Sequence, residues 1–127
     1  MRLASIRLAC LVAIGLAVPL RAEEASGIEF FESKVRPLLA SQCYKCHSEE
    51  AAKAGKLKGA LRLDTRAGVA KGGEAGPIIK PGKPEESRMI KSVRYTDENL
   101  QMPPKQRLSG EEVAILEKWV AMGAPDP

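Results

Sequence analysis

The sequence predicts an all-α fold: a small helical domain with a glycine- and proline-rich loop region between its first and last helices. Two segments near the ends of the chain, 27–42 and 109–122, combine helix-capping signals with apolar residues at helical spacing. Between them, residues 57–82 contain six glycines and two prolines and show no sustained helical period. So few helices form a thin core, and we therefore expect a buried cofactor at the centre of the domain.

The first 22 residues are typical of a secretory signal peptide. Arg2 and Arg7 precede an apolar run of 13 residues, 8–20, and Ala22 suggests cleavage before Glu23. Thirteen residues are too few to span about 30 Å of hydrocarbon as a helix, although an uncleaved membrane anchor is the alternative interpretation. We expect a leader at 1–22 and one domain at 23–127, exported to the periplasm or beyond, with no membrane span after cleavage.

The charge of the mature chain is close to zero. The leader carries three arginines and no acids, so the 20 basic and 16 acidic residues of the whole chain leave a balance of +1 after residue 22. With few aromatics and no concentrated basic stripe, nothing favours nucleic-acid binding. Cys10 leaves with the leader, so the exported chain keeps two cysteines.

The first helix is expected from Gly27 to Gln42. Ser26 and Glu29 have the spacing of a capping box, and Pro37 should kink or restart the helix near Arg36. The apolar residues on one side are Phe30, Phe31, Val35, Leu38 and Leu39.

Two more helices are expected in the second half of the chain. Pro84 suits the first position of a helix that ends near Arg94, with Met89, Ile90 and Val93 on its buried side. The last helix begins with the capping box of Ser109 and Glu112 and ends before Gly123. In the loop region, Asp64 is a candidate cap for a short helical turn over 65–70, and Leu61 and Leu63 suggest a brief extended segment.

Cys43, Cys46 and His47 form a Cys-x-x-Cys-His motif, which is typical of haem c attachment. In a helical turn, thiols at i and i+3 lie on one side and reach both vinyl groups of one porphyrin. The histidine that follows projects its imidazole toward the iron as proximal ligand. The motif predicts one covalent haem c, with its iron, in this chain.

Three other chemistries compete for these residues. A structural zinc site needs four protein ligands, but the mature chain has no cysteine or histidine beyond these three. A redox dithiol expects a βαβ context, which is missing. A disulfide would close too short a loop to stabilise much, and it would leave the histidine unexplained. Haem attachment is the favoured interpretation.

The sixth iron ligand is not a second histidine of this chain, because the chain has only one. Met89 and Met122 fall on apolar helix faces, where core packing explains them. Met102 lies in the polar loop ENLQMPPKQ, 55 residues after His47, and Pro103 and Pro104 stiffen the backbone behind it. We expect Met102 as the distal ligand; the alternatives are a weaker group, water or no ligand, with Met102 an incidental loop residue.

Several blocks of the sequence together resemble the planctomycete-type cytochrome c domain of the class I cytochrome c superfamily. The blocks are CYKCHS, KGALRLDTRAGVAKGG, GPIIKPGKPEES, VRYTDENLQMPPK and LEKWVAMGAP, and the similarity extends from Phe30 to Pro125. The resemblance implies the class I cytochrome c fold, in which the first and last helices cross near the haem edge. The candidates for that contact are Phe31, Leu38, Leu116 and Trp119.

The resemblance also implies roles for individual residues. Cys43 and Cys46 would hold the haem, with His47 proximal and Met102 distal. Gly76-Pro77 resembles a segment that gives a backbone carbonyl to the proximal imidazole, so Pro77 is expected to accept from His47 Nδ1, unless it only shapes the loop. The candidates for the haem propionates are Arg62, Arg94, Tyr95 and Trp119.

These features predict a periplasmic monohaem electron carrier, not an enzyme, with redox proteins as donor and acceptor. A net charge near zero argues against strong electrostatic steering and favours docking through an apolar rim. Similar domains often begin larger secreted proteins, whereas this chain stops after the domain, so a haem subunit of a dehydrogenase complex is an alternative. A haem sensor or enzyme with a labile Met102 is another, although the lack of a distal histidine counts against peroxidase chemistry.

Overall fold

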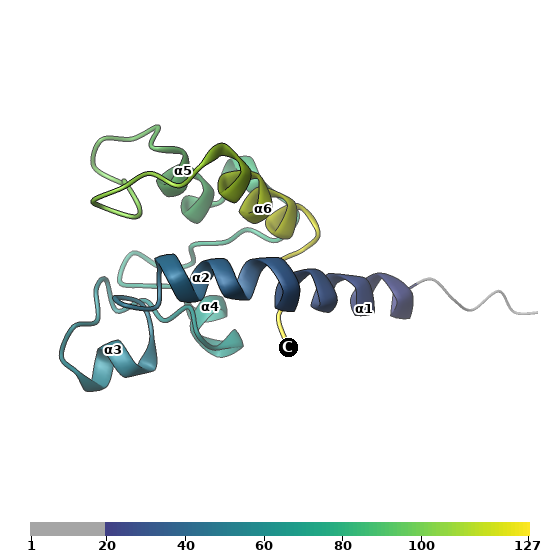
Figure 1. Ribbon diagram of the computed structural model, residues 1–127, viewed down its shortest axis with the longest axis horizontal. Coiled ribbons are helices and arrows are strands. Elements are labelled where there is room, and N and C mark those ends of the chain that lie inside the picture. The colour runs from purple at the N-terminus through teal and green to yellow at the C-terminus, as the bar shows by residue number, and fades with distance from the viewer. Residues whose placement is uncertain (1–19) are drawn as a thin grey trace, which may run out of the picture.

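The computed structural model describes residues 20–127, and the predicted leader lies almost wholly outside this range. Within it the chain is helical with no strand, and its only bridge joins Gly73 to Gly76. In Figure 1, α5 and α6 lie on one side of the long first helix and α3 and α4 on the other. The elements are α1 (Leu20–Phe30), a π-helical segment (Phe31–Val35), α2 (Arg36–Gln42), α3 (Glu49–Lys53), α4 (Arg66–Lys71), a 3₁₀ turn (Pro84–Glu86), α5 (Arg88–Arg94) and α6 (Gly110–Ala121).

The first helix is longer than predicted and runs without interruption from α1 through the π-helical segment into α2. The expected restart near Arg36 is present, because α2 begins at Arg36 after the π-helical segment. Pro37 has no N–H to donate, and the N–H of Arg36 reaches back five residues to Phe31 O. Ser26 is not a cap, because it lies inside α1 and its hydroxyl donates to Glu23 O. No helix within residues 20–127 is long and apolar enough to cross a membrane.

The last helix confirms its predicted capping box. Ser109 Oγ accepts from the N–H of Glu112, and the Glu112 carboxylate accepts from the N–H of Ser109. α6 packs across the π-helical segment, where the rings of Phe31 and Trp119 lie 5.6 Å apart between centroids and both side chains are buried. The indole N–H of Trp119 donates to Pro125 O at 2.8 Å.

The helix predicted over 84–94 is divided in two. Ser87 separates the 3₁₀ turn from α5; it is buried, and its hydroxyl donates to Lys83 O and accepts from Lys80 N. Met89, Ile90 and Val93 are buried as predicted.

Two short helices lie between the Cys-x-x-Cys-His motif and residue 72, and their caps are a serine and a threonine. Ser48 caps α3, which was not singled out from the sequence, and Thr65 caps α4 by accepting from Gly68 N–H. Asp64 was expected to cap this second helix; the prediction is wrong, because its carboxylate instead accepts from Glu49 N–H at 2.9 Å. The hydrogen bond between Asp64 and Glu49 therefore joins the loop at residue 64 to the first turn of α3.

Candidate functional site

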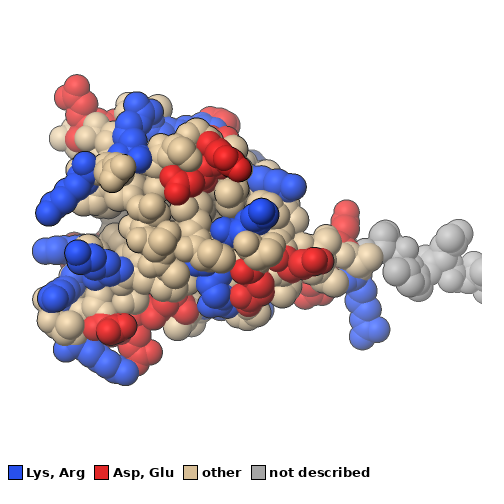
Figure 2. All heavy atoms as spheres, viewed as in Figure 1, with Lys and Arg blue, Asp and Glu red and all other residues tan. Residues whose placement is uncertain are grey.

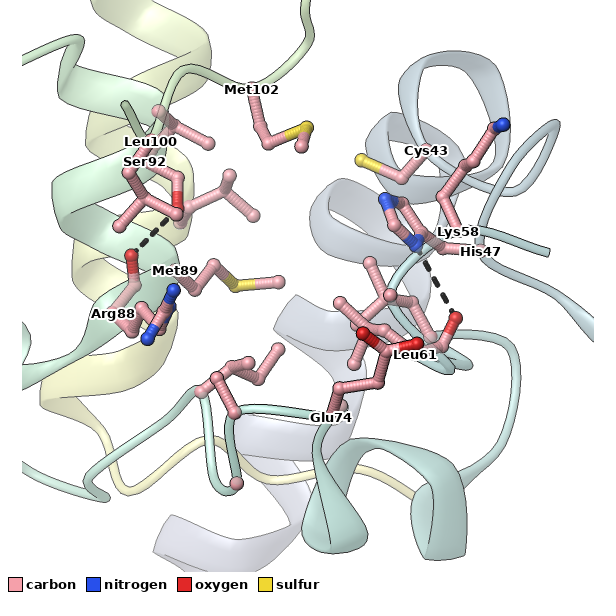
Figure 3. A pocket seen from close by; sticks show the side chains of 18 residues that line it. Cys43, His47, Lys58, Leu61, Glu74, Arg88, Met89, Ser92, Leu100 and Met102 are labelled. Atoms are coloured by element: carbon pink, nitrogen blue, oxygen red, sulfur yellow. Dashed lines mark hydrogen bonds between the residues drawn. The ribbon is translucent and has the colours of Figure 1, made fainter. Parts of the chain in front are cut away.

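The helices and the loop region enclose a cavity of about 290 Å³ whose walls are mainly apolar. Figure 3 shows Met102, Met89 and Arg88 on the wall formed by α5 and the loop that follows it. His47, Cys43, Lys58 and Leu61 occupy the facing wall. The core residue Leu116 of α6 also lines the cavity, so the cavity lies against the hydrophobic core.

The attachment turn, residues 43–47, is a tight turn at the end of α2. The carbonyl of Cys43 accepts from the N–H groups of Cys46 at 3.1 Å and His47 at 2.9 Å. Cys43 and His47 line the cavity, whereas Cys46, three residues along the same turn, does not. Burial raises the pKa of the Cys43 thiol to about 11, and the neighbouring Cys46 adds to the rise.

His47 is held by the loop segment that follows α3. Its Nδ1 lies 3.3 Å from Leu61 O, and its own carbonyl accepts from Leu63 N–H at 2.9 Å. Because a carbonyl only accepts, this contact places the imidazole hydrogen on Nδ1 and leaves Nε2 with a free lone pair. The nitrogen that could bind a metal is therefore Nε2.

The carbonyl that faces His47 is not the one expected from the sequence. Pro77 was predicted to accept from Nδ1, but Leu61 O takes that position, and Pro77 is not among the residues that line the cavity. The chain reaches the imidazole sooner because Lys58 N–H bonds to Cys46 O at 3.0 Å, which turns the segment back onto the attachment turn. The prediction for Pro77 is corrected to Leu61.

Met102 is positioned by two hydrogen bonds of its loop. Its N–H donates to Ser92 O of α5 at 3.1 Å, and the hydroxyl of Tyr95 donates to the carbonyl of the next residue, Pro103. Its side chain points across the cavity toward His47 and Cys43 (Figure 3). Met102 is 37% exposed and lies outside the hydrophobic core.

Met89 also directs its thioether into the cavity (Figure 3). It is 7% exposed and belongs to the hydrophobic core, in line with the packing role expected from its helix face. Two sulfurs therefore approach the cavity from one wall, and Met122, which is exposed, does not line it.

The four candidates for the propionates do not line the cavity. Arg94 forms ion pairs with Glu85 and Glu117, and the Tyr95 and Trp119 polar atoms donate to backbone carbonyls. The cations that do line it are Lys58 and Arg88, neither of which has an ion-pair partner among residues 20–127. Glu74 also lines the cavity, on the wall that carries Leu61 and Lys58 (Figure 3).

The structure thus brings together Cys43, His47 and Met102 and adds residues that sequence reasoning missed. Leu61 was considered only as part of an extended segment, and Lys58 and Arg88 were not considered as part of the site. The sequence did contain a signal for Lys58 and Leu61. Both belong to the block LKGALRLD, which follows the Cys-x-x-Cys-His motif closely enough for the chain to fold back against it. Nothing in the local pattern marked Arg88, because its position depends on how α5 packs.

A scan against protein-family models matches residues 43–106 to the family described as planctomycete cytochrome C. No curated protein and no solved structure matches the chain. The matched segment begins at the first cysteine of the motif and extends past Met102, and it covers half of the 127 residues. A cytochrome c domain indicates a haem-binding electron carrier. The helical fold, the cavity and the family match agree, and the chain belongs to the planctomycete cytochrome C family.

Proposed function

We propose that the protein is an exported monohaem cytochrome c of the class I fold, which carries one electron at a time through an iron held by His47 and Met102. The observation that carries the proposal is the facing arrangement of these two side chains across one apolar cavity, with the Cys43 thiol at its edge (Figure 3). A free imidazole nitrogen and a thioether are the two donors that such an iron takes.

The residues present fit haem c in their chemistry. Cys43 and Cys46 are both free thiols, spaced to form thioethers with two vinyl groups of one porphyrin. The apolar walls suit the ring, and Lys58 and Arg88 offer positive charge for its two propionates. When bound, the haem supplies the one-electron chemistry by cycling between ferric and ferrous iron.

The protein's own contribution is to orient and tune the ligands. The Leu61 carbonyl fixes the His47 ring through Nδ1, and such a bond raises the basicity of the ligating nitrogen. A thioether on the other side raises the reduction potential. No acid–base pair is needed for this function.

The choice of Met102 over Met89 supports a direct test. Met89 is part of the hydrophobic core, whereas Met102 is held by backbone hydrogen bonds on both sides of its residue and is free to give its sulfur to a metal. The oxidised protein should show the weak long-wavelength charge-transfer band of a methionine bond to ferric iron. Met102→Ala should abolish that band, and the matched change Met89→Ala should keep it at some cost in stability.

Two outcomes would count against this assignment. A wild-type protein without the band would remove Met102 as a ligand and favour a sensor or enzyme with an open iron position. Loss of the band in Met89→Ala alone would move the ligand to α5. Mass spectrometry of the purified chain tests the rest, because one haem and cleavage before Glu23 give a single expected mass.

The partners we propose are redox proteins that meet the cavity mouth. Capture of an associated dehydrogenase from the exported fraction would distinguish a carrier that moves freely between partners from a subunit of a dehydrogenase complex. A stable complex at equal stoichiometry would identify a dedicated subunit.

A further inference from the structure

Two polar atoms beside the attachment turn are buried without a hydrogen-bond partner among residues 20–127: the hydroxyl oxygen of Tyr44 and Oδ1 of Asp64. Buried polar groups are nearly always paired, because an unpaired one bears its full desolvation cost. Both residues line one cavity of about 510 Å³, which shares no lining residue with the cavity between His47 and Met102. The haem site therefore leaves these two atoms unexplained.

The two side chains bracket the attachment turn. Tyr44 lies between the two cysteines, three residues before His47. Asp64 reaches the other end, because its Oδ2 accepts a hydrogen bond of 2.9 Å from the N–H of Glu49, two residues after His47. Next to Asp64, the segment 61–63 makes the two hydrogen bonds that hold the histidine. A link between the side chains of Tyr44 and Asp64 would therefore connect the two ends of the attachment turn.

The hydrogen-bonding capacities of the two atoms are complementary. Burial raises the pKa of the Tyr44 phenol; the charge of Arg36 acts to lower this pKa and the charge of Asp64 to raise it, and because the net change is a rise, the hydroxyl keeps its proton. Arg36 also lies near this hydroxyl, but a guanidinium only donates, so the hydroxyl hydrogen still needs an acceptor. Asp126 is a second carboxylate near Tyr44, but it has no buried oxygen without a partner.

We infer that one bound water joins the Tyr44 hydroxyl to Asp64 Oδ1, and that this brace makes Asp64 a positioning residue for His47. Both oxygens are buried away from solvent, so a water between them would be an enclosed one, and such a water needs the polar partners that these two atoms offer. The brace itself does not depend on haem, whereas its effect on His47 as a ligand rests on the proposed function. With the brace intact, segment 61–63 stays against the turn and Leu61 O stays on Nδ1.

The haem-loaded protein tests the brace through its reduction potential. Tyr44→Phe removes the hydroxyl without changing any charge. The loosened Leu61 contact makes the imidazole less basic, ferric iron is stabilised less, and the potential should rise. Asp64→Asn replaces the unpaired carboxylate oxygen by an amide donor and should also raise the reduction potential. Because both changes break one brace, Tyr44→Phe should cause no further shift in the Asp64→Asn protein.

Asp126→Asn is the matched control, because it makes the same chemical change at the other carboxylate near Tyr44. In that protein Tyr44→Phe should shift the potential by its full amount. Proton NMR of the ferrous protein gives a second measure: a slowly exchanging Tyr44 hydroxyl proton should persist in Asp126→Asn and be lost in Asp64→Asn. Additive shifts for the Tyr44 and Asp64 changes, or an unchanged potential in Tyr44→Phe, would overturn the inference.

The two proposals fail separately. A chain without haem c would contradict the proposed function. The hydroxyl resonance, and the same pair of substitutions followed by urea unfolding, would still test the brace in that chain.

Discussion

Cys43 is the residue whose acid–base chemistry should change most when the haem is attached. Burial raises the pKa of its thiol to about 11 from an ordinary value of 9.0. A thiol with a raised folded-state pKa stabilises the fold fully below its unfolded pKa and loses that contribution as the pH rises through the folded value. A chain produced without haem should therefore lose about 2 kcal/mol of unfolding free energy between pH 9 and pH 11.

Urea unfolding at a series of pH values measures this loss. The haem-loaded protein is one control, because a thioether has no proton to lose, and Cys43→Ser without haem is the other. Both should lack this part of the pH dependence. An equally steep decline of the unfolding free energy in Cys43→Ser would show that other groups cause the pH dependence.

At the scale of single residues, the sequence predicted the motif better than its surroundings. Cys43 and His47 share one cavity wall because the Cys43 carbonyl accepts from the N–H groups of Cys46 and His47 and so closes a tight turn over residues 43–47. The carbonyl facing His47 was assigned to Pro77, yet it belongs to Leu61, which no residue-type signal marks. Every residue has a carbonyl, so which one meets the imidazole depends on how the loop folds back.

Among the structural elements, the loop that follows α4 depends most on glycine. Gly72 has a φ of +75°, and a Cβ there would overlap the carbonyl of Gly76, which accepts from Gly73 N–H. Gly72→Ala should therefore combine backbone strain with this clash and cost about 3 kcal/mol or more. The next residues, 73–76, line the cavity, so the absorption spectrum of the bound haem should change as well.

Gly82→Ala is the matched control for this substitution. Gly82 has nearly the same φ, +78°, but a Cβ there would meet nothing within 4 Å. Its cost should be limited to the strain of a positive φ, about 1 to 2 kcal/mol, with an unchanged spectrum. Equal losses in urea unfolding for the two variants would show that the Gly76 clash is relieved at little cost.

The start of the last helix was predicted better than the start of the first, although both have capping-box spacing and an apolar face in the sequence. α6 has both a capping box and an apolar face, and its start at Ser109 is confirmed. From Pro37, the first helix was expected to kink or restart near Arg36, and α2 does begin at Arg36, directly after the π-helical segment.

In the whole molecule, charge is distributed less evenly than the balance of +1 over residues 23–127 suggests. Figure 2 shows Lys and Arg side chains on both sides of a notch at one end of the molecule. Lys58 and Arg88 line the cavity, and Lys105 follows Met102 by three residues; none of the three has an ion-pair partner among residues 20–127. Several other cations are paired with glutamates, as Arg94 is with Glu85 and Glu117.

This local excess predicts electrostatic steering that the net charge hides. Electron transfer from the ferrous protein to hexacyanoferrate(III), an anion, should slow several-fold as ionic strength rises from about 0.01 to 0.3 M, because screening shortens the reach of the cations near the cavity. A cationic cobalt(III) complex should instead react faster over the same range. Stopped-flow absorbance of the haem measures both rates.

Two lysine substitutions separate local from net charge. Lys105→Glu and Lys34→Glu change the net charge equally, and neither lysine lines the cavity. Lys105 is three residues from Met102 in the chain, whereas Lys34 lies in the π-helical segment of the first helix. Lys105→Glu should weaken the salt dependence with the anion, whereas Lys34→Glu should leave most of it. If both variants change the salt dependence equally, the reagents respond to net charge. The docking surface would then be the apolar rim that the sequence predicted. A response confined to Lys105→Glu would instead mean that electrons enter between the basic side chains at the cavity mouth.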